Sequence, residues 1–344
     1  MDRTKQNDIV RRASAMADKA PFVADDFAQA LFPRTDVAFN DRMRSNARQY
    51  LRGVVSQIEQ RICHIATRDL GVADELLLSI GEDGEGQSLA LLEQSGLLNR
   101  PEIVQHLFVR AQQSELAARL LQKISQEDLE STLTRHLDHA DPAVAEAAMG
   151  LLVAQSKTTG AAGETAASLA DLPPEIVYAI VWPVTAALAR LSSTAGVRLQ
   201  QAAERLLAEH DESAGVARKA ERLAQLLEQT ETENDPHPMK DGLTLFVARL
   251  ARQSGLTSDQ IVTFTAEPDM ARLVIMLRAA DYPVQEALSI YVALDSGENI
   301  LTAATYGELD RDRAVALVSR WAAPDAYQNA DRILARAYLG EDRQ

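Results

Sequence analysis

The amino-acid sequence predicts an all-α protein, an array of antiparallel helix pairs stacked as an α-solenoid, which linkers would divide into two lobes. Hydrophobic residues make up 46% of the 344-residue chain and aromatic residues 5%, so the chain can build a sizeable core. Ala, Leu, Glu, Gln and Arg dominate and runs of β-branched residues are scarce, which favours helices. Residues 91–155 contain short amphipathic helices separated by turns, a pattern typical of helical repeats.

The N-terminal part of the chain is predicted to contain one long helix. A short polar helix at residues 1–20 and an aromatic-rich segment at 21–33 precede it. The long helix begins at Asn40 or Asp41, either of which can cap it. Its predicted buried stripe is Met43, Ala47, Tyr50, Leu51, Val54, Ile58, Ile62 and Ile65. Its other face is basic, with Glu59 nearly the only acid and with Arg44, Arg48, Arg52, Arg61 and Arg68.

The middle of the chain shows proline-marked helix starts. Asp141-Pro142 and Leu172-Pro173-Pro174 each place proline in a first helical turn, where the backbone N–H groups have no partner within the helix. Residues 176–184 are the most strand-like run, but flanking helix formers and the absence of a second strand favour a helix that Pro183 should kink. A helix pair at 196–210 and 214–229 follows.

The C-terminal part is predicted to return to short helices. Thr257-Ser258-Asp259 reads as a helix cap, and Asp281-Tyr282-Pro283 as a helix start. Trp321 and Tyr338 are expected to close the end of the core. The predicted helices span 243–253, 257–266, 269–279, 283–294, 299–306, 311–321 and 325–339.

Composition shifts divide the chain at two linkers. Residues 156–171 are rich in Ala, Thr and Gly, and residues 230–238 are acidic and contain two prolines. The predicted organisation is N-terminal helices at 1–70, helical repeats at 71–155, a linker at 156–171, central helices at 172–229, an acidic linker at 230–238 and C-terminal helical repeats at 239–344.

The turn that ends in Asp141-Pro142-Ala143-Val144 resembles the inter-helix turn of HEAT-type repeats, whose second helix commonly starts Asp-Pro-x-Val. Families with this turn often carry Arg after the Val, whereas this chain has Ala145. The resemblance covers about one repeat. A second pattern is internal, because residues 94–97 (QSGL) recur at 253–256 with an Ile-Val pair following each copy. Duplication and a chance match between Ala- and Leu-rich helices both explain it.

Three segments resemble an alphaproteobacterial helical-repeat family filed as a domain of unknown function. They are the long helix with Glu59 followed by Arg61, the segment SGLLNRPEIVQHL, and the Leu-Pro-opened helix LPPEIVYAIVWPVTAALARL with its Trp. The resemblance spans about residues 40–294 and consists of core positions. It implies a HEAT-like helical fold and brings no known catalytic residues.

Charge and cysteine content indicate the compartment. The single cysteine, Cys63, rules out an internal disulfide and points to a reducing compartment. No apolar run reaches the roughly 18 residues of a membrane span, and the N-terminus lacks the apolar core of a signal peptide. We therefore expect a cytoplasmic protein. The net charge of −15 is uneven: Lys and Arg number 12 against 9 Asp and Glu through Asp69, and 23 against 41 after it.

No motif for catalysis, cofactor or metal binding is recognised. The loop Gly81–Gly86 holds three acids that would repel a phosphate, and it lacks the ligand spacing of a calcium loop. His136 and His139 lie near Asp138 and Asp141, but Pro142 interrupts the helix that a shared metal site would need. The repeat turn explains these aspartates, so we expect no bound metal and little loss of stability when both histidines are replaced.

The sequence therefore predicts a non-enzymatic scaffold or regulatory adaptor that binds other proteins. The candidate binding residues are the arginines of the long helix, Arg44, Arg48, Arg52, Arg61 and Arg68, which would either dock a partner or pair with the acidic later part of the chain. A second interpretation is a sensor with a small-molecule or lipid pocket between helix layers, lined by Val181, Trp182 and Val184. A third is nucleic-acid binding at the arginines, which the overall acidity and the lack of interleaved aromatics argue against. The oligomeric state stays open.

Overall fold

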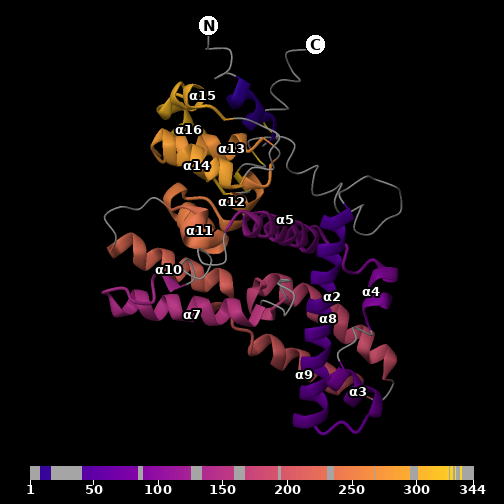
Figure 1. Ribbon diagram of the computed structural model, residues 1–344. Coiled ribbons are helices and arrows are strands. Elements are labelled where there is room, and N and C mark those ends of the chain that lie inside the picture. The colour runs from indigo at the N-terminus through magenta and orange to yellow at the C-terminus, as the bar shows by residue number, and fades with distance from the viewer. Residues whose placement is uncertain are drawn as a thin grey trace, which may run out of the picture.

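The all-α prediction is confirmed by the computed structural model (Figure 1): across the residues that it describes, every regular element is helical. These residues are 8–16, 41–83, 88–124, 134–158, 167–192, 195–230, 236–267, 269–294, 301–324, 326, 327, 330 and 334. The helices are α2 Asp41–His64, α3 Glu75–Asp83, α4 Leu89–Ser95, α5 Pro101–Lys123, α7 Pro142–Thr158, α8 Pro174–Leu191, α9 Gly196–Ala208, α10 Val216–Thr230, α11 Pro238–Ser254, α12 Ser258–Thr265, α13 Ala271–Ala279, α14 Val284–Leu294, α15 Ala303–Gly307 and α16 Arg311–Trp321. Residues 8–16 are also helical, a π-helical turn η1 (Ile65–Asp69) extends α2, and two 3-10 turns are η2 (Leu169–Asp171) and η3 (Glu212–Ala214).

The helix starts that the sequence marks are formed by side-chain caps. Thr257 Oγ1 accepts a hydrogen bond from the Gln260 amide at 3.2 Å, and Gln260 Oε1 accepts one from the Thr257 amide at 2.9 Å. This reciprocal capping box satisfies two N–H groups that have no partner within the helix. At the start of α7, Asp141 Oδ1 accepts from the Ala143 amide at 2.8 Å. The predicted starts at Thr257 and Asp141-Pro142 are therefore confirmed.

The first hydrophobic core is built around α2, which packs against α3, α5, α8 and α9 (Figure 1). All eight predicted stripe positions lie in or against this core: Met43 and Tyr50 are half-buried and pack against it, and the other six are buried, namely Ala47, Leu51, Val54, Ile58, Ile62 and Ile65. The α8 helix supplies the facing side with Ile176, Val177, Ile180, Val181, Val184 and Leu188. Burial of such side chains is worth about 1.5–3 kcal/mol each relative to full exposure.

Two further cores hold the rest of the chain. The second joins helix 8–16, the second half of α5 and α11–α16, and contains the T-shaped pair of Phe264 and Trp321. Trp321 therefore lies in the core as predicted, whereas Tyr338 lies outside the described residues. The third core is smaller and joins α7, α10 and α11. In Figure 1, α10 lies between α11 and α7.

Contacts between helices follow the chain in part. Consecutive helices pack together at α2–α3, α8–α9, α10–α11 and α13–α14, as an array of helix pairs requires. Other contacts join helices far apart in the sequence, such as α2 with α8 and α7 with α10. A solenoid is held by contacts between neighbouring repeats, so these distant contacts are not part of the predicted pattern, and the solenoid arrangement stays a prediction.

The α8 helix settles the question of the strand-like run, since residues 176–184 are helical throughout, with Pro183 inside the helix. Its 18 residues are long and apolar enough to cross a membrane by length and composition alone. Half of this stretch is buried against other helices, as expected for the core helix of a folded domain.

Some predicted boundaries differ from the helices. Gly81 lies within α3 rather than in a turn, and Gly84 and Gly86 lie outside the described residues. The α7 helix continues to Thr158, so residues 156–158 of the predicted linker are helical; residues 159–166 and 231–235 lie outside the described residues. Ala- and Thr-containing helix ends carry weak stop signals, which makes such boundaries hard to read.

Candidate functional site

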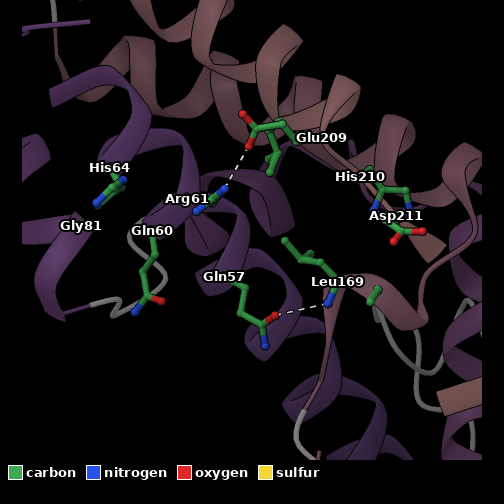
Figure 2. A pocket seen from close by; sticks show the side chains of 11 residues that line it. Gln57, Gln60, Arg61, His64, Gly81, Leu169, Glu209, His210 and Asp211 are labelled. Carbon is green, nitrogen blue, oxygen red and sulfur yellow. Dashed lines mark hydrogen bonds and ion pairs between the residues drawn. The ribbon is translucent and has the colours of Figure 1, made fainter. Parts of the chain in front are cut away.

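A groove of about 510 Å3 lies between α2, α3, α9 and the two 3-10 turns (Figure 2). It brings Arg61, one of the predicted binding residues, into a concave surface. Its lining is polar along α2 and at the end of α9. The residues that line it are Gln57, Gln60, Arg61, His64, Gly81, Leu169, Ala170, Leu206, Glu209, His210 and Asp211.

One side of the groove is fixed by a chain of ion pairs. Arg61 Nη2 donates to Glu209 Oε2 at 2.9 Å, as Figure 2 shows. Arg205 Nε donates to Glu209 Oε1 at 2.8 Å, and its Nη1 lies 3.1 Å from Asp69 Oδ2. Hydrogen bonds from Arg205 and Arg61 hold the pKa of Glu209 below its ordinary value. Acidic and basic side chains therefore alternate along this chain of ion pairs, which links α2 to α9 and runs through Asp69, Arg205, Glu209 and Arg61.

The other side is fixed by hydrogen bonds to the backbone. The Gln57 side chain donates to the Ala167 carbonyl and accepts from the Leu169 amide at 3.3 Å. His210 Nε2 lies 3.1 Å from the Leu172 carbonyl oxygen, which requires the tautomer that donates from this nitrogen. These hydrogen bonds hold the Gln57 and His210 side chains in fixed positions in the groove wall. The polar surface of the groove is therefore already formed without a ligand.

A second cavity of about 790 Å3 lies between α5, α10, α11, α12 and η2. Polar groups lie on its α5, η2 and α12 sides, and among them His106 is buried. His106 Nε2 lies 3.5 Å from the Tyr50 hydroxyl, and Arg110 Nη2 donates to Asp259 Oδ1 at 2.5 Å. Asp171 Oδ1 accepts from the Val216 amide at 2.5 Å. A cavity of this volume could hold a small molecule.

Burial shifts the titration of this second group. It lowers the pKa of His106 to about 4, with the Arg110 charge as a second cause. Burial raises the pKa of Asp171, against the hydrogen bond from the Val216 amide and the Arg110 charge. It also raises the pKa of Tyr50. At neutral pH the imidazole is therefore uncharged, and it can donate or accept a hydrogen bond at the cavity wall.

The five predicted binding arginines divide into two groups. Arg61 and Arg68 lie at carboxylates of other helices, Glu209 at 2.9 Å and Glu82 at 3.9 Å. Arg44 pairs with Asp41 in the same helix, and Arg48 and Arg52 are exposed. Of the two alternatives that the sequence left open, pairing with the acidic later part therefore applies to Arg61 and Arg68.

Glu59 does not belong to the basic face on which the sequence placed it. It is fully buried, and its Oε1 accepts from the Ser88 amide at 2.5 Å. A buried carboxylate requires such partners. Glu59 therefore joins α2 to the start of α4.

The residues proposed for a sensor pocket lie elsewhere. Val181 and Val184 are fully buried in the first core. Trp182 is half-buried and meets the exposed Tyr178, with ring centroids 6.2 Å apart. None of the three lines either cavity described above. A pocket between helix layers does occur, but other residues form it.

The two histidines of the Asp141 turn have different environments. His139 is part of the turn, where its Nδ1 accepts from the Asp141 amide at 3.0 Å. His136 is buried, with Nε2 4.0 Å from Oδ1 of the buried Asp241, to which Arg249 Nη1 also donates at 3.1 Å. Replacing His136 should therefore affect stability, contrary to our expectation from the sequence.

No group of three or more His, Cys, Asp and Glu side chains lies close enough to hold a metal ion within the described residues. Comparison with models of protein families, with curated proteins and with solved structures found no match. The resemblance to the alphaproteobacterial helical-repeat family thus stays a prediction from the residues.

Proposed function

We propose that the protein is a non-enzymatic scaffold or regulatory adaptor of a bacterial cytoplasm, and that it docks an acidic protein partner on the first half of α2. The observation that carries this proposal is the row of arginines along the first half of α2, where Arg48 and Arg52 are exposed and Arg44 is half-buried. The three are four residues apart and therefore share one stripe of the helix.

The surrounding charge makes this stripe distinctive. The protein carries a net charge of −15, so an acidic partner is repelled by most of its surface. Exposed charges act over about a Debye length, roughly 8–10 Å at physiological salt. A local arginine stripe therefore selects where an acidic partner can approach, and complementary charge sets the orientation of docking. The predicted HEAT- or armadillo-like pairing of helices belongs to the same proposal, because such arrays present long accessible surfaces.

A charge reversal tests the docking site. Arg48→Glu/Arg52→Glu should leave the melting temperature near that of the wild type but abolish recovery of a partner from cell lysate. Arg198→Glu/Arg222→Glu is the matched control, since both residues are exposed and the net charge changes equally. Wild-type binding should also weaken with added salt.

Two outcomes would contradict this proposal. A melting temperature that falls by many degrees with unchanged partners would give Arg48 and Arg52 a structural role. Loss of the partner in both double variants would indicate a dependence on net charge rather than on the α2 stripe.

A sensor of small polar molecules is the second candidate function, and the 790 Å3 cavity supports it. Its wall includes His106 and Asp171, whose burial favours their uncharged forms. Native mass spectrometry of the purified protein tests this candidate. A retained small molecule that His106→Phe releases would support a sensor, and a ligand-free wild type would favour the adaptor.

A further inference from the structure

The α7 helix exposes one stripe on the side that α10 does not cover. Glu146, Met149, Val153 and Lys157 follow one another at spacings of three, four and four residues, which places them on a single helix face. All four are exposed, Met149 by 49% and Val153 by 45% of its surface. The opposite face packs into the third core. The stripe therefore has an apolar centre and an oppositely charged residue at each end.

The composition of α7 is unusual for an outer helix. Glu146 and Lys157 are the only charged residues among its 17. Helices that are apolar nearly all round are normally buried on both sides, and the outermost helices of a stacked array usually present a polar face to water. In Figure 1, α7 instead lies on the side of α10 opposite α11. Its outer face has the character of an interface.

The stripe is complementary to itself. In an antiparallel pair of two α7 helices centred near Leu151, Met149 faces Val153 of the second copy. The same centre places Glu146 opposite Lys157 of the second copy, within one residue's rise of about 1.5 Å. A two-fold axis repeats each of these contacts, which is the arrangement of an isologous interface.

We infer that the stripe of Glu146, Met149, Val153 and Lys157 is an interface between two copies of this chain, packed antiparallel about a two-fold axis near Leu151. The pattern of charges selects this occupant, because the acidic end lies five residues and the basic end six residues from the apolar centre at Leu151, which matches a reversed copy of the same helix to within one residue. The surface is separate from the arginine stripe of α2. One helix pair is smaller than the roughly 1,200 Å2 of a standard interface, so the dimer is weak and depends on concentration.

Sedimentation velocity across a range of protein concentrations tests the interface. The wild-type protein should shift from monomer to dimer as the concentration rises. Met149→Glu should remain monomeric over the same range, because it places two carboxylates in the apolar centre. Val197→Glu is the matched control, since Val197 is 69% exposed on α9, away from α7. A wild type that stays monomeric throughout, or a dimer that Met149→Glu leaves intact, overturns the inference.

An exchange of charges tests the antiparallel arrangement. Glu146→Lys alone and Lys157→Glu alone should each be monomeric, because each places like charges opposite one another twice. An equimolar mixture of the two variants should form a heterodimer with both pairs restored, and the variant with both substitutions should dimerise like the wild type. A mixture that associates no more than its components overturns the antiparallel pairing. Circular dichroism melting of each variant shows that its fold is intact.

Discussion

Arg61 on α2 is joined to Glu209 at the end of α9 by a hydrogen bond of 2.9 Å, although 148 positions separate them in the sequence. Glu209 receives a second hydrogen bond from Arg205 on its own helix. The Arg61 and Glu209 side chains are 52% and 38% exposed. Water and salt screen exposed ion pairs, so this contact adds little to the stability of the fold. Its main effect is to position the Arg61 and Glu209 side chains in the groove wall.

We expect Arg61→Ala to change the melting temperature little, and the change to disappear in high salt. The lowered pKa of Glu209 determines how this contribution depends on pH. The small stabilisation from the ion pair is present at neutral pH and is lost as the pH falls through the lowered pKa of Glu209. Thermal melting at two salt concentrations measures this, with Arg198→Ala as the exposed control. A salt-independent drop of many degrees would show that the pair is structurally essential.

Asp241 should be among the residues most sensitive to substitution. Its side chain is fully buried and accepts hydrogen bonds from Arg249 Nη1 at 3.1 Å and from the His237 amide at 2.9 Å. Asp241→Asn leaves Arg249 charged in the interior, which costs about 3–5 kcal/mol. Urea unfolding measures the loss. Asp259→Asn is the control; Asp259 is half exposed, so its pair with Arg110 is worth about 1 kcal/mol or less.

The contacts of the Asp241 carboxyl also predict how the stability of the protein depends on pH. Burial alone would raise the pKa of this carboxyl, but the contacts with His136, Arg249 and the His237 amide outweigh burial and lower it. The stabilisation is therefore present at neutral pH and is lost as the pH falls through the lowered pKa. Equal acid sensitivity of the wild type and Asp241→Asn would contradict this account.

The two histidines near the α7 turn should respond differently to the same substitution. His136→Gln should lower the free energy of unfolding by about 1–3 kcal/mol, because His136 is buried beside Asp241. His139→Gln should have a smaller effect, since His139 contributes one hydrogen bond at a partly exposed turn. Urea unfolding of the two single variants compares them. Equal losses would place both residues in the same environment.

His106 should make the protein less stable in mild acid. Burial lowers its pKa from 6.5 to about 4, so the unfolded chain binds a proton that the folded chain excludes in this range. The free energy of unfolding should fall by up to about 3 kcal/mol between pH 6.5 and pH 4. Urea unfolding of the wild type and of His106→Gln measures the difference. Parallel curves for the two proteins would show that His106 is accessible to protons.

Cys63 should resist thiol reagents while the protein is folded. The residue is buried in the first core, and burial, with the Glu59 charge as a second cause, raises the pKa of its thiol to about 12. Thiolate is the reactive form, so dithionitrobenzoate at pH 8 should release little chromophore from native protein. One thiol per chain should react in guanidinium chloride. Complete reaction of the native protein within minutes would contradict the burial of Cys63.

The helix patterns could be predicted from the sequence because their signals are local. The bounds of α16 and the cap at Thr257 follow from residues within a few positions of each other. The buried stripe of α2 follows from a repeat of three and four residues, which a one-sided helix imposes. Glu59 shows the limit of this reasoning, because its position suggested the polar face whereas its partner is the amide of Ser88.

The cavities could not be predicted from the sequence for a related reason. The groove joins Gln57 and Arg61 on α2 to Glu209 at the end of α9, and 148 positions separate Arg61 from Glu209. The second cavity, of about 790 Å3, has His106 on α5 and Asp171, the last residue of the predicted linker, in its wall. Neither residue stands out in the sequence, since a lone histidine and an aspartate before Leu-Pro fit a structural role. Only the tertiary packing places His106 and Asp171 in the wall of one cavity.

The α5 helix has a consequence for how the molecule unfolds. Its first half, including Ile103 and Leu107, is part of the first core, and Leu116 and Leu120 in its second half belong to the second. Loss of this helix would expose apolar surface in both cores at once. Neither core could unfold completely while α5 stays packed in the other core. We therefore expect the two parts of the chain to unfold as one cooperative unit, with a disturbance of either part reaching the other through α5.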